Sequence, residues 1–217
     1  MRRLTDVFSM KMITFAHGKR LHNMAGLPQG CSFLFFFSHQ RQAFKTHMEK
    51  HDYSVLGSED EFKIIGKEWM LVTAGGADEV NTMTASWGGM GWLWNKPVAF
   101  VFIRPERYTH GLIESNDRFS LSFYTEDYKR ALQLCGSVSG RDHDKIREAG
   151  LTPVSLDNGV VTFSEARLSI SCRKLFKTEM TECDFIDKDI LARWYNEKPG
   201  GGLHTIYIAE IESVYTD

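Results

Sequence analysis

Residues 81–94 carry three kinds of side chain that together could hold a flat, phosphorylated heterocycle. The run Asn-Thr-Met-Thr-Ala-Ser-Trp-Gly-Gly-Met-Gly-Trp-Leu-Trp contains three hydroxyls, three glycines and three tryptophans. Hydroxyls donate and accept hydrogen bonds, glycines let backbone N–H groups come close to a ligand, and tryptophans offer flat apolar faces. The alternative interpretation of the same residues is a surface β-hairpin with a glycine-rich bend.

A second segment, residues 104–109, adds two cations and a hydroxyl at the end of an expected strand. Arg104 and Arg107 are followed by Thr109, where a helix is expected to begin. Guanidinium groups match the oxygens of a phosphate, and helix N-termini favour anions. The segment therefore suits an anion site, although solvated loop arginines would give the same sequence.

A third segment, residues 136–145, joins two expected helices through a glycine- and serine-rich loop. Its candidate phosphate ligands are Ser137, Ser139, Gly140 and Lys145. Small hydroxyl residues and a lysine near a helix N-terminus suit an anion. The segment is not the G-x-x-x-x-G-K-[ST] loop of nucleoside triphosphatases, and no G-x-G-x-x-G follows a strand. A capped connection between two helices is the alternative.

The candidate catalytic residue is His204, which follows the glycine run 200–202 at the start of the last expected strand. A histidine there could donate to a ligand or shuttle a proton, whereas a partly exposed structural histidine is the alternative. Residues 142–144, Asp-His-Asp, lie in one expected helical turn without a second cluster of ligands. We therefore expect no metal site.

The composition excludes several classes of protein. Hydrophobic residues make up 42% and charged residues 25%, as in a soluble globular protein. The formal net charge of −2 argues against binding of nucleic acid, which relies on neutralising phosphates. The four cysteines show no C-x-x-C spacing and fit buried thiols in a reducing cytosol. The longest apolar runs, 33–37 and 98–103, are too short to span a bilayer. We expect a cytoplasmic protein without a nucleic-acid or membrane partner.

The first 47 residues differ in charge from the rest of the chain. They carry seven basic side chains and one acid, hence +6, while the remainder carries 19 basic and 27 acidic side chains, hence −8. No hydrophobic periodicity is sustained in them. We expect residues 1–47 to be disordered, or a mis-called extension of a chain that starts at Met48. Residues 48–217 are expected to form one domain.

Hydrophobic patterning predicts a mainly β fold with helical insertions. The expected strands are 68–73, 80–86, 97–104, 118–124, 160–163, 166–176 and 204–214. The expected helices are 108–114 with Thr109 as its cap, 126–135 closed by Gly136, 140–149 capped by Ser139, and 187–195. Strands and helices do not alternate regularly, which disfavours a doubly wound parallel sheet. An antiparallel barrel fits the order better.

Together, the three polar segments resemble the flavin reductase-like family of FMN-binding split barrels, including its flavoredoxin branch. The resemblance covers roughly residues 62–214 and rests on the order and spacing of residues 81–87, 104–109 and 136–142. It implies an antiparallel split β-barrel, a homodimer, FMN bound near the subunit interface, and NADH or NADPH as co-substrate in many members. His204 resembles a histidine that some members place near the nicotinamide. The FMN-binding residues implied by the resemblance are Asn81, Thr82, Met83, Thr84, Ala85, Ser86, Trp87, Arg104, Arg107, Thr109, Ser137, Ser139, Gly140 and Lys145.

The function implied by the resemblance is that of an FMN-dependent oxidoreductase that transfers hydride from NAD(P)H to flavin. FMN performs the redox chemistry in such proteins, so the protein has to bind and orient it. One alternative is a flavoredoxin-like electron-transfer protein that receives electrons from a redox partner protein. The other is a ligand-binding barrel without a redox role. The sequence leaves the choice between NADH and NADPH open, because it contains no dinucleotide fingerprint.

Overall fold

The computed structural model describes residues 48–76, 78–195 and 202–217 of the chain. These residues belong to one unit, which spans Gln42–Asp217. The expectation that residues 1–47 are a disordered or mis-called extension concerns a part of the chain outside the described residues. Within the described ranges, no helix is both long enough and apolar enough to cross a bilayer.

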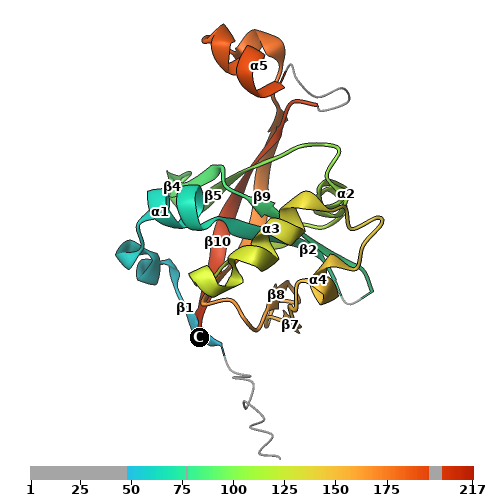
Figure 1. Cartoon of the computed structure of the whole chain (residues 1–217). Coiled ribbons are helices and arrows are strands. Elements are labelled where there is room, and N and C mark those ends of the chain that lie inside the picture. Colours follow the sequence, from blue (N-terminus) through green and yellow to red (C-terminus); the bar gives the residue numbers. More distant parts are fainter. Residues whose placement is uncertain (1–47, 77, 196–201) are drawn as a thin grey trace, which may run out of the picture. The chain divides into compact units, whose positions relative to one another are not determined.

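One antiparallel sheet dominates the described part of the chain (Figure 1). Its neighbouring strands follow the order β3–β2–β6–β9–β10–β5–β4, and β1 pairs with the end of β10. β7 and β8 form a separate hairpin. The strands are β1 (Glu49–His51), β2 (Met70–Gly75), β3 (Val80–Ala85), β4 (Gly88–Leu93), β5 (Lys96–Ile103), β6 (Arg118–Phe123), β7 (Pro153–Ser155), β8 (Val161–Phe163), β9 (Leu168–Glu179) and β10 (Thr205–Thr216). The mainly β, antiparallel fold expected from the sequence is confirmed.

The helices cover the sheet or extend beyond it. α2 and α3 both pack against β2 and β3. α5 lies at the end of the long β9 and β10 strands that is remote from the C-terminus (Figure 1). The α-helices are α1 (Glu61–Lys63), α2 (Tyr108–Ser115), α3 (Lys129–Ser137), α4 (Lys145–Glu148) and α5 (Lys188–Tyr195). Short 3-10 or π turns are η1 (Tyr53–Ser58), η2 (Ile64–Glu68), η3 (Glu126–Tyr128) and η4 (Glu182–Asp184).

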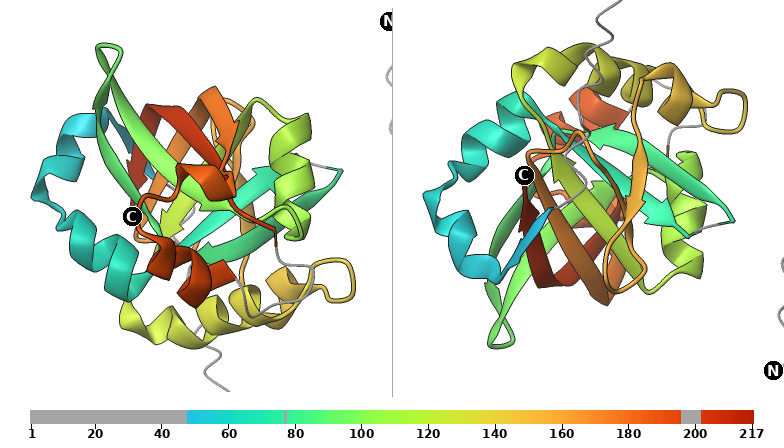
Figure 2. Two further views of the ribbon diagram at one scale, coloured as in Figure 1. Left: turned by 90° about the horizontal axis from the view of Figure 1, so that it is seen from above. Right: turned by 90° about the horizontal axis from the view of Figure 1, so that it is seen from below.

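The sheet is curled, because its two edge strands are consecutive in the chain. β3 and β4 lie at opposite ends of the strand order, yet only Ser86 and Trp87 separate them. A chain spans at most about 3.6 Å per residue, so the end of β3 and the start of β4 lie within about 11 Å of each other. The sheet therefore wraps around until its edges approach, as the end-on views show (Figure 2). The result is a split barrel.

Both faces of the curled sheet are buried where α3 covers it. Leu71 and Val72 are neighbours on β2, so their side chains point to opposite faces. Val72 belongs to the large hydrophobic cluster inside the barrel, whereas Leu71 belongs to a smaller cluster that includes Leu132 of α3. β10 is buried mainly on one face over its first half, because Tyr207 and Ala209 are buried whereas Ile208 between them is partly exposed. The continuous apolar run of β2 and the alternating run of β10 follow from these positions.

Each of the seven expected strands overlaps an observed one. The tryptophan-rich stretch 81–94, however, contributes to two strands that do not pair with each other. Its first half is β3, which pairs with β2, and its second half is β4, which pairs with β5. The hairpin interpretation therefore holds for residues 88–93 only. The turn to β5 uses Trp94 and Asn95, whose φ angles are 52° and 57°. Two consecutive left-handed residues match the right-handed twist of a two-residue hairpin.

The expected helix 140–149 is wrong in its extent and its cap. α4 spans only Lys145–Glu148, and its cap is Asp144, whose side chain accepts a hydrogen bond from the Arg147 N–H at 3.3 Å. Ser139 instead accepts from the Arg141 N–H within the preceding loop, at 3.2 Å between Oγ and N. Ser139 therefore serves a turn in the loop that lines the cavity described below.

Two further cap expectations are wrong. α3 does not stop before Gly136 but includes it and ends at Ser137. A Cβ on Gly136 would lie 3.2 Å from Cβ of Thr84, so the glycine allows α3 to pack closely on β3. Thr109 lies inside α2, whose cap position is occupied by Arg107. The Thr109 hydroxyl instead accepts a hydrogen bond from Nδ2 of Asn81 at 2.7 Å.

Candidate functional site

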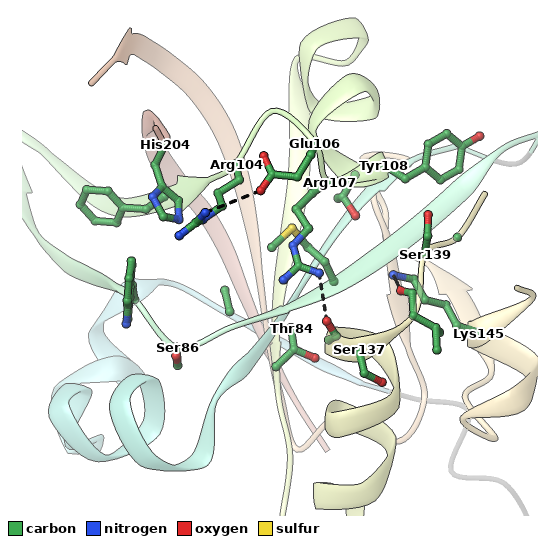
Figure 3. A pocket seen from close by; sticks show the side chains of 18 of the residues that line it. Thr84, Ser86, Arg104, Glu106, Arg107, Tyr108, Ser137, Ser139, Lys145 and His204 are labelled. Atoms are coloured by element: carbon green, nitrogen blue, oxygen red, sulfur yellow. Dashed lines mark hydrogen bonds and ion pairs between the residues drawn. The ribbon is translucent and has the colours of Figure 1, made fainter. Parts of the chain in front are cut away.

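The three polar segments meet around a cavity of about 960 Å³, at the point where the chain passes from β3 to β4 (Figure 3). The end of β5, the start of α2, the loop after α3, the end of α5 and the residue before β10 complete its wall. Most of the residues predicted from the sequence to bind a ligand line it. These are Met83, Thr84, Ala85, Ser86, Trp87, Arg104, Arg107, Thr109, Ser137, Ser139, Gly140, Lys145 and His204.

Asn81 and Thr82 lie outside the cavity, and their side chains bond within the protein. Asn81 donates to Thr109 and thereby ties β3 to the first turn of α2. The Thr82 hydroxyl is fully buried and donates to the Val72 carbonyl at 3.2 Å. Both residues lie in the first half of β3, whereas the lining residues of this run come from its second half and from the linker to β4.

Lys145 supplies a buried positive charge at one end of the cavity. Only 4% of the residue is exposed. Its ammonium group donates to the carbonyls of Cys135 at 3.1 Å and Val138 at 3.3 Å, and it has no acidic partner among the described residues. Burial lowers the pKa of Lys145, because the charged form loses hydration. A third N–H of the ammonium group remains for an anion in the cavity.

Arg107 connects the two helices that flank this end of the cavity. Its Nη1 donates to the Gly136 carbonyl at 2.9 Å, across from the start of α2 to the end of α3 (Figure 3). That carbonyl belongs to the last turn of α3, where carbonyls lack partners within the helix. The remaining guanidinium N–H groups stay available, so Arg107 both shapes the cavity and adds charge to it.

His204 lies at the opposite end of the cavity from Lys145 (Figure 3). Its Nδ1 is 2.7 Å from the hydroxyl of Tyr195, and its ring packs 5.2 Å from that of Trp87. Burial, and then the positive charges of Arg104 and Arg107, lower the pKa of His204 to about 4. The imidazole is therefore neutral at physiological pH and does not act there as a cation.

Arg104 attaches α5 to this end of the cavity. Its Nη2 donates to the Trp194 carbonyl at 2.9 Å, and its guanidinium carbon lies 5.1 Å from the centre of the Tyr195 ring. A cation at the last carbonyls of a helix compensates groups that have no intrahelical partner. The indole of Trp194 in turn meets Trp87 edge to face, with 5.3 Å between ring centres. α5 is thus held against the site by two hydrogen bonds, Arg104–Trp194 and Tyr195–His204, and by aromatic contacts.

The order of these segments agrees with a known family. The family model of the flavin reductase like domain matches residues 63–217. The chain belongs to the flavin reductase-like family. No curated protein matches it.

Several solved structures share the fold of this chain. An FMN-binding protein from Thermus thermophilus is 24% identical, with 69% of this chain and 71% of that chain covered and a TM-score of 0.53. Flavoredoxin from Methanosarcina acetivorans is 20% identical, with 69% and 68% covered and a TM-score of 0.54. The NADH:FAD oxidoreductase of Streptomyces globisporus is 14% identical, with 69% and 75% covered and a TM-score of 0.51. At these identities the likeness concerns the split-barrel fold.

The cavity of this flavin reductase-like chain also includes residues that were not predicted as ligands. They are Phe102, Glu106, Tyr108, Gly136, Val138, Arg193 and Trp194. Four of them, Glu106, Tyr108, Gly136 and Val138, lie within the predicted segments and could have been included with their neighbours. No local sequence pattern marks Arg193 and Trp194 as ligand-binding residues, because an ordinary solvent-exposed helix would carry the same kinds of side chain.

Cations outnumber acids around the cavity. Arg104, Arg107, Lys145 and Arg193 line it, whereas Glu106 is its one acidic lining residue among those described. Arg104 and Glu106 partly neutralise each other, with 3.8 Å between Nη1 and the carboxylate (Figure 3). The chain as a whole carries a net charge of −2, so this excess of positive charge is local. A cavity of this kind attracts an anionic ligand.

Proposed function

We propose that the chain binds FMN in this cavity and acts as an oxidoreductase of flavin reductase type, with NADH or NADPH as its reductant. Membership of the flavin reductase-like family supports the flavin. The observation that carries the proposal is the buried ammonium group of Lys145, which has no acidic partner among the described residues and lines the cavity. A buried charge is costly unless it is paired, and the phosphate of FMN would pair it.

The residues at the Lys145 end fit a phosphate group. Arg107 and Lys145 supply charge, and Ser137 and Ser139 supply hydroxyls from the loop between α3 and α4. Arginine and lysine form charge-assisted hydrogen bonds with phosphate oxygens, which are stronger than bonds between neutral groups. Gly140 lets this loop pack closely on β3, because a Cβ there would lie 2.1 Å from Oδ1 of Asn81.

The remainder of the cavity fits a flat aromatic ring. Thr84 and Ser86 bring polar groups from the end of β3, and Trp87 and Phe102 bring aromatic faces. When bound, FMN supplies the capacity to accept a hydride, and the protein supplies binding, orientation and electrostatics. His204 is neutral above its pKa of about 4, so it serves as a hydrogen-bonding group rather than as an acid at neutral pH.

A flavoredoxin-like electron carrier is the second candidate function. The indoles at the mouth of the cavity favour it, because 41% of Trp87 and 49% of Trp194 are exposed. Exposed aromatic groups beside a redox site would suit docking of a partner protein. In this case the FMN would be reduced by a protein and not by a nicotinamide nucleotide.

Purification and anaerobic reduction test both candidates. We expect a yellow protein whose released cofactor is FMN, and bleaching of its visible absorption by NADH or NADPH without oxygen. A flavin that is stable to both nucleotides but is reduced by a reductase protein would favour the electron carrier. A protein that neither retains nor binds FMN would exclude both and leave a ligand-binding barrel.

We also propose that the chain forms a homodimer in the cytoplasm. Large aromatic side chains are exposed around the β4–β5 hairpin, where Tyr53 lies 5.7 Å from Trp92 and Trp94 lies 6.2 Å from Phe176, measured between ring centres. Contiguous exposed apolar groups are typical of interaction surfaces. Cys135 and Cys172 are unpaired and buried, which suits a reducing compartment.

A further inference from the structure

Arg193 is a cation on the cavity wall that has no ligand in the proposed FMN site. It lies in the last turn of α5, and its guanidinium group makes no ion pair or hydrogen bond with another described residue. Its closest aromatic neighbour is the adjacent Trp194, with 5.4 Å between the guanidinium carbon and the ring centre. A free arginine beside an indole at the edge of a cavity is suited to an anion that also carries an aromatic group.

Arg193 belongs to the His204 end of the cavity and not to the Lys145 end. Trp194 contacts Trp87, and Trp87 contacts His204, at 5.3 and 5.2 Å between ring centres. Figure 3 shows His204 and Arg104 on one side of the cavity, and Ser139 and Lys145 on the other. The cavity therefore has two cationic ends, whereas FMN carries a single phosphate group.

α5 is held in place firmly enough to form a binding wall. Arg104 bonds the Trp194 carbonyl at 2.9 Å and stacks on Tyr195, and the hydroxyl of Tyr195 bonds His204 at 2.7 Å. These contacts link α5 to β5 and to the start of β10. Side chains on α5 consequently keep a defined position relative to His204, as specific recognition requires.

We infer that the α5 end of the cavity is a second anion subsite, where Arg193 binds a phosphate group of the pyridine dinucleotide while Trp194 and Trp87 contact its aromatic rings. The inference rests on the proposed function, because it assigns the second ligand of the same cavity. The phosphate is either the pyrophosphate, which NADH and NADPH share, or the 2′-phosphate of NADPH alone. In both cases the guanidinium forms a charge-assisted hydrogen bond that it lacks in the free protein.

The test measures binding and not turnover. FMN-loaded protein is titrated with NAD⁺ and NADP⁺ in a calorimeter, since the oxidised nucleotides bind without reducing the cofactor, and apoprotein is titrated with FMN. The variants are Arg193→Ala, Arg193→Lys and Arg193→Glu. The matched control is Arg130→Ala, because Arg130 is exposed on α3 and does not line the cavity.

We expect Arg193→Ala to weaken nucleotide binding about tenfold or more, Arg193→Glu to weaken it further, and Arg193→Lys to retain part of the affinity. FMN affinity should stay within about twofold in all three variants, because FMN uses the Lys145 end. A loss for NADP⁺ alone assigns the 2′-phosphate, and an equal loss for both nucleotides assigns the pyrophosphate.

Three results would overturn the inference. Nucleotide affinity that is unchanged in Arg193→Ala shows that Arg193 is no ligand, and a parallel loss of FMN affinity shows that it serves the FMN instead. Wild-type holoprotein that binds neither nucleotide has no such subsite. Failure of FMN binding looks different, because it shows in the wild-type chain before any variant is compared.

Discussion

At the scale of single residues, two titratable groups are buried beside the same cavity and serve different purposes. Burial lowers the pKa of Lys145 and also that of His204. The Lys145 ammonium group bonds two carbonyls and has no acidic partner among the described residues, so it is suited to pair with an anion. His204 starts near neutrality, and its pKa of about 4 makes it neutral. The cavity therefore combines a buried ammonium group at one end with a neutral hydrogen-bonding group at the other.

Lys145→Met should separate stability from cofactor binding. Methionine keeps the shape of the side chain and removes the unpaired charge, so we expect the apoprotein to change in free energy of unfolding by no more than about 1 kcal/mol. FMN affinity should fall about tenfold or more, because a charge-assisted bond to phosphate is lost. Urea unfolding of apoprotein and FMN fluorescence titration measure the two effects. FMN affinity equal to that of wild type would show that Lys145 is not a phosphate ligand.

His204 should make stability depend on pH in a defined window. Its pKa is about 4 in the folded chain and about 6.5 in an unfolded chain, so the unfolded state binds more protons between these values. Stability is therefore fully present above about pH 6.5 and is lost as the pH falls toward 4. Urea unfolding at pH 7.5 and pH 5 should show a larger loss for wild type than for His204→Gln. Equal losses would contradict the lowered pKa of His204.

At the scale of elements, the loop between α3 and α4 has a fixed shape because it packs tightly against β3 and α2. A Cβ on Gly140 would lie 2.1 Å from Oδ1 of Asn81 and 3.1 Å from the ring of Tyr108. Asn81 is itself fixed by its bond to Thr109. The loop backbone thus lies directly on a buried polar contact between β3 and α2, and no side chain fits between them.

Gly140→Ala should damage both the fold and the site. The new methyl group must displace Asn81 or the loop, so we expect a loss of about 1–3 kcal/mol in free energy of unfolding and weaker FMN binding. The matched control is Gly111→Ala, because Gly111 lies within α2 and its Cβ would meet nothing within 4 Å. That change should stabilise the protein by about 0.5–1 kcal/mol. Thermal unfolding and FMN titration measure the two effects. Equal stability and equal FMN affinity of the two variants would contradict the packing argument.

At the scale of the whole molecule, the split in the barrel creates the site. β3 and β4 approach each other without pairing, and the linker Ser86–Trp87 crosses between them. The cavity lies along this crossing and is completed by α5, which comes from the connection between β9 and β10. A closed barrel would fill this position with strand pairing and interior side chains.

The exposed aromatic side chains of the β4–β5 hairpin should be covered by a second copy of the chain. We expect sedimentation velocity to give twice the mass of one chain at micromolar concentration. Trp92→Lys should shift the protein toward monomer, because a charge replaces an apolar group in the contact. Lys50→Ala is the control, since Lys50 lies on β1 and its side chain pairs with Asp157. A wild-type protein that sediments as a monomer at all concentrations would contradict the dimer.

The sequence determined the parts of the protein that depend on neighbours along the chain. Alternation and apolar runs located seven strands, and the chemistry of residues 81–87, 104–109 and 136–145 located three walls of the cavity. These signals are local, because strand faces and turn residues are set by the backbone over a few positions. The family resemblance followed from the order of the same three segments.

Only the tertiary structure decided which segments face each other. It separated β3 from β4, engaged the side chains of Asn81 and Thr82 in hydrogen bonds within the protein, and brought Arg193 and Trp194 into the cavity wall. Arg193 lies on a helix whose sequence resembles any solvated helix, so no local pattern distinguishes it. Its place follows from the contact between Arg104 and the Trp194 carbonyl, which joins residues 90 positions apart. Contacts of that range arise from packing of the whole domain and leave no periodic trace in the sequence.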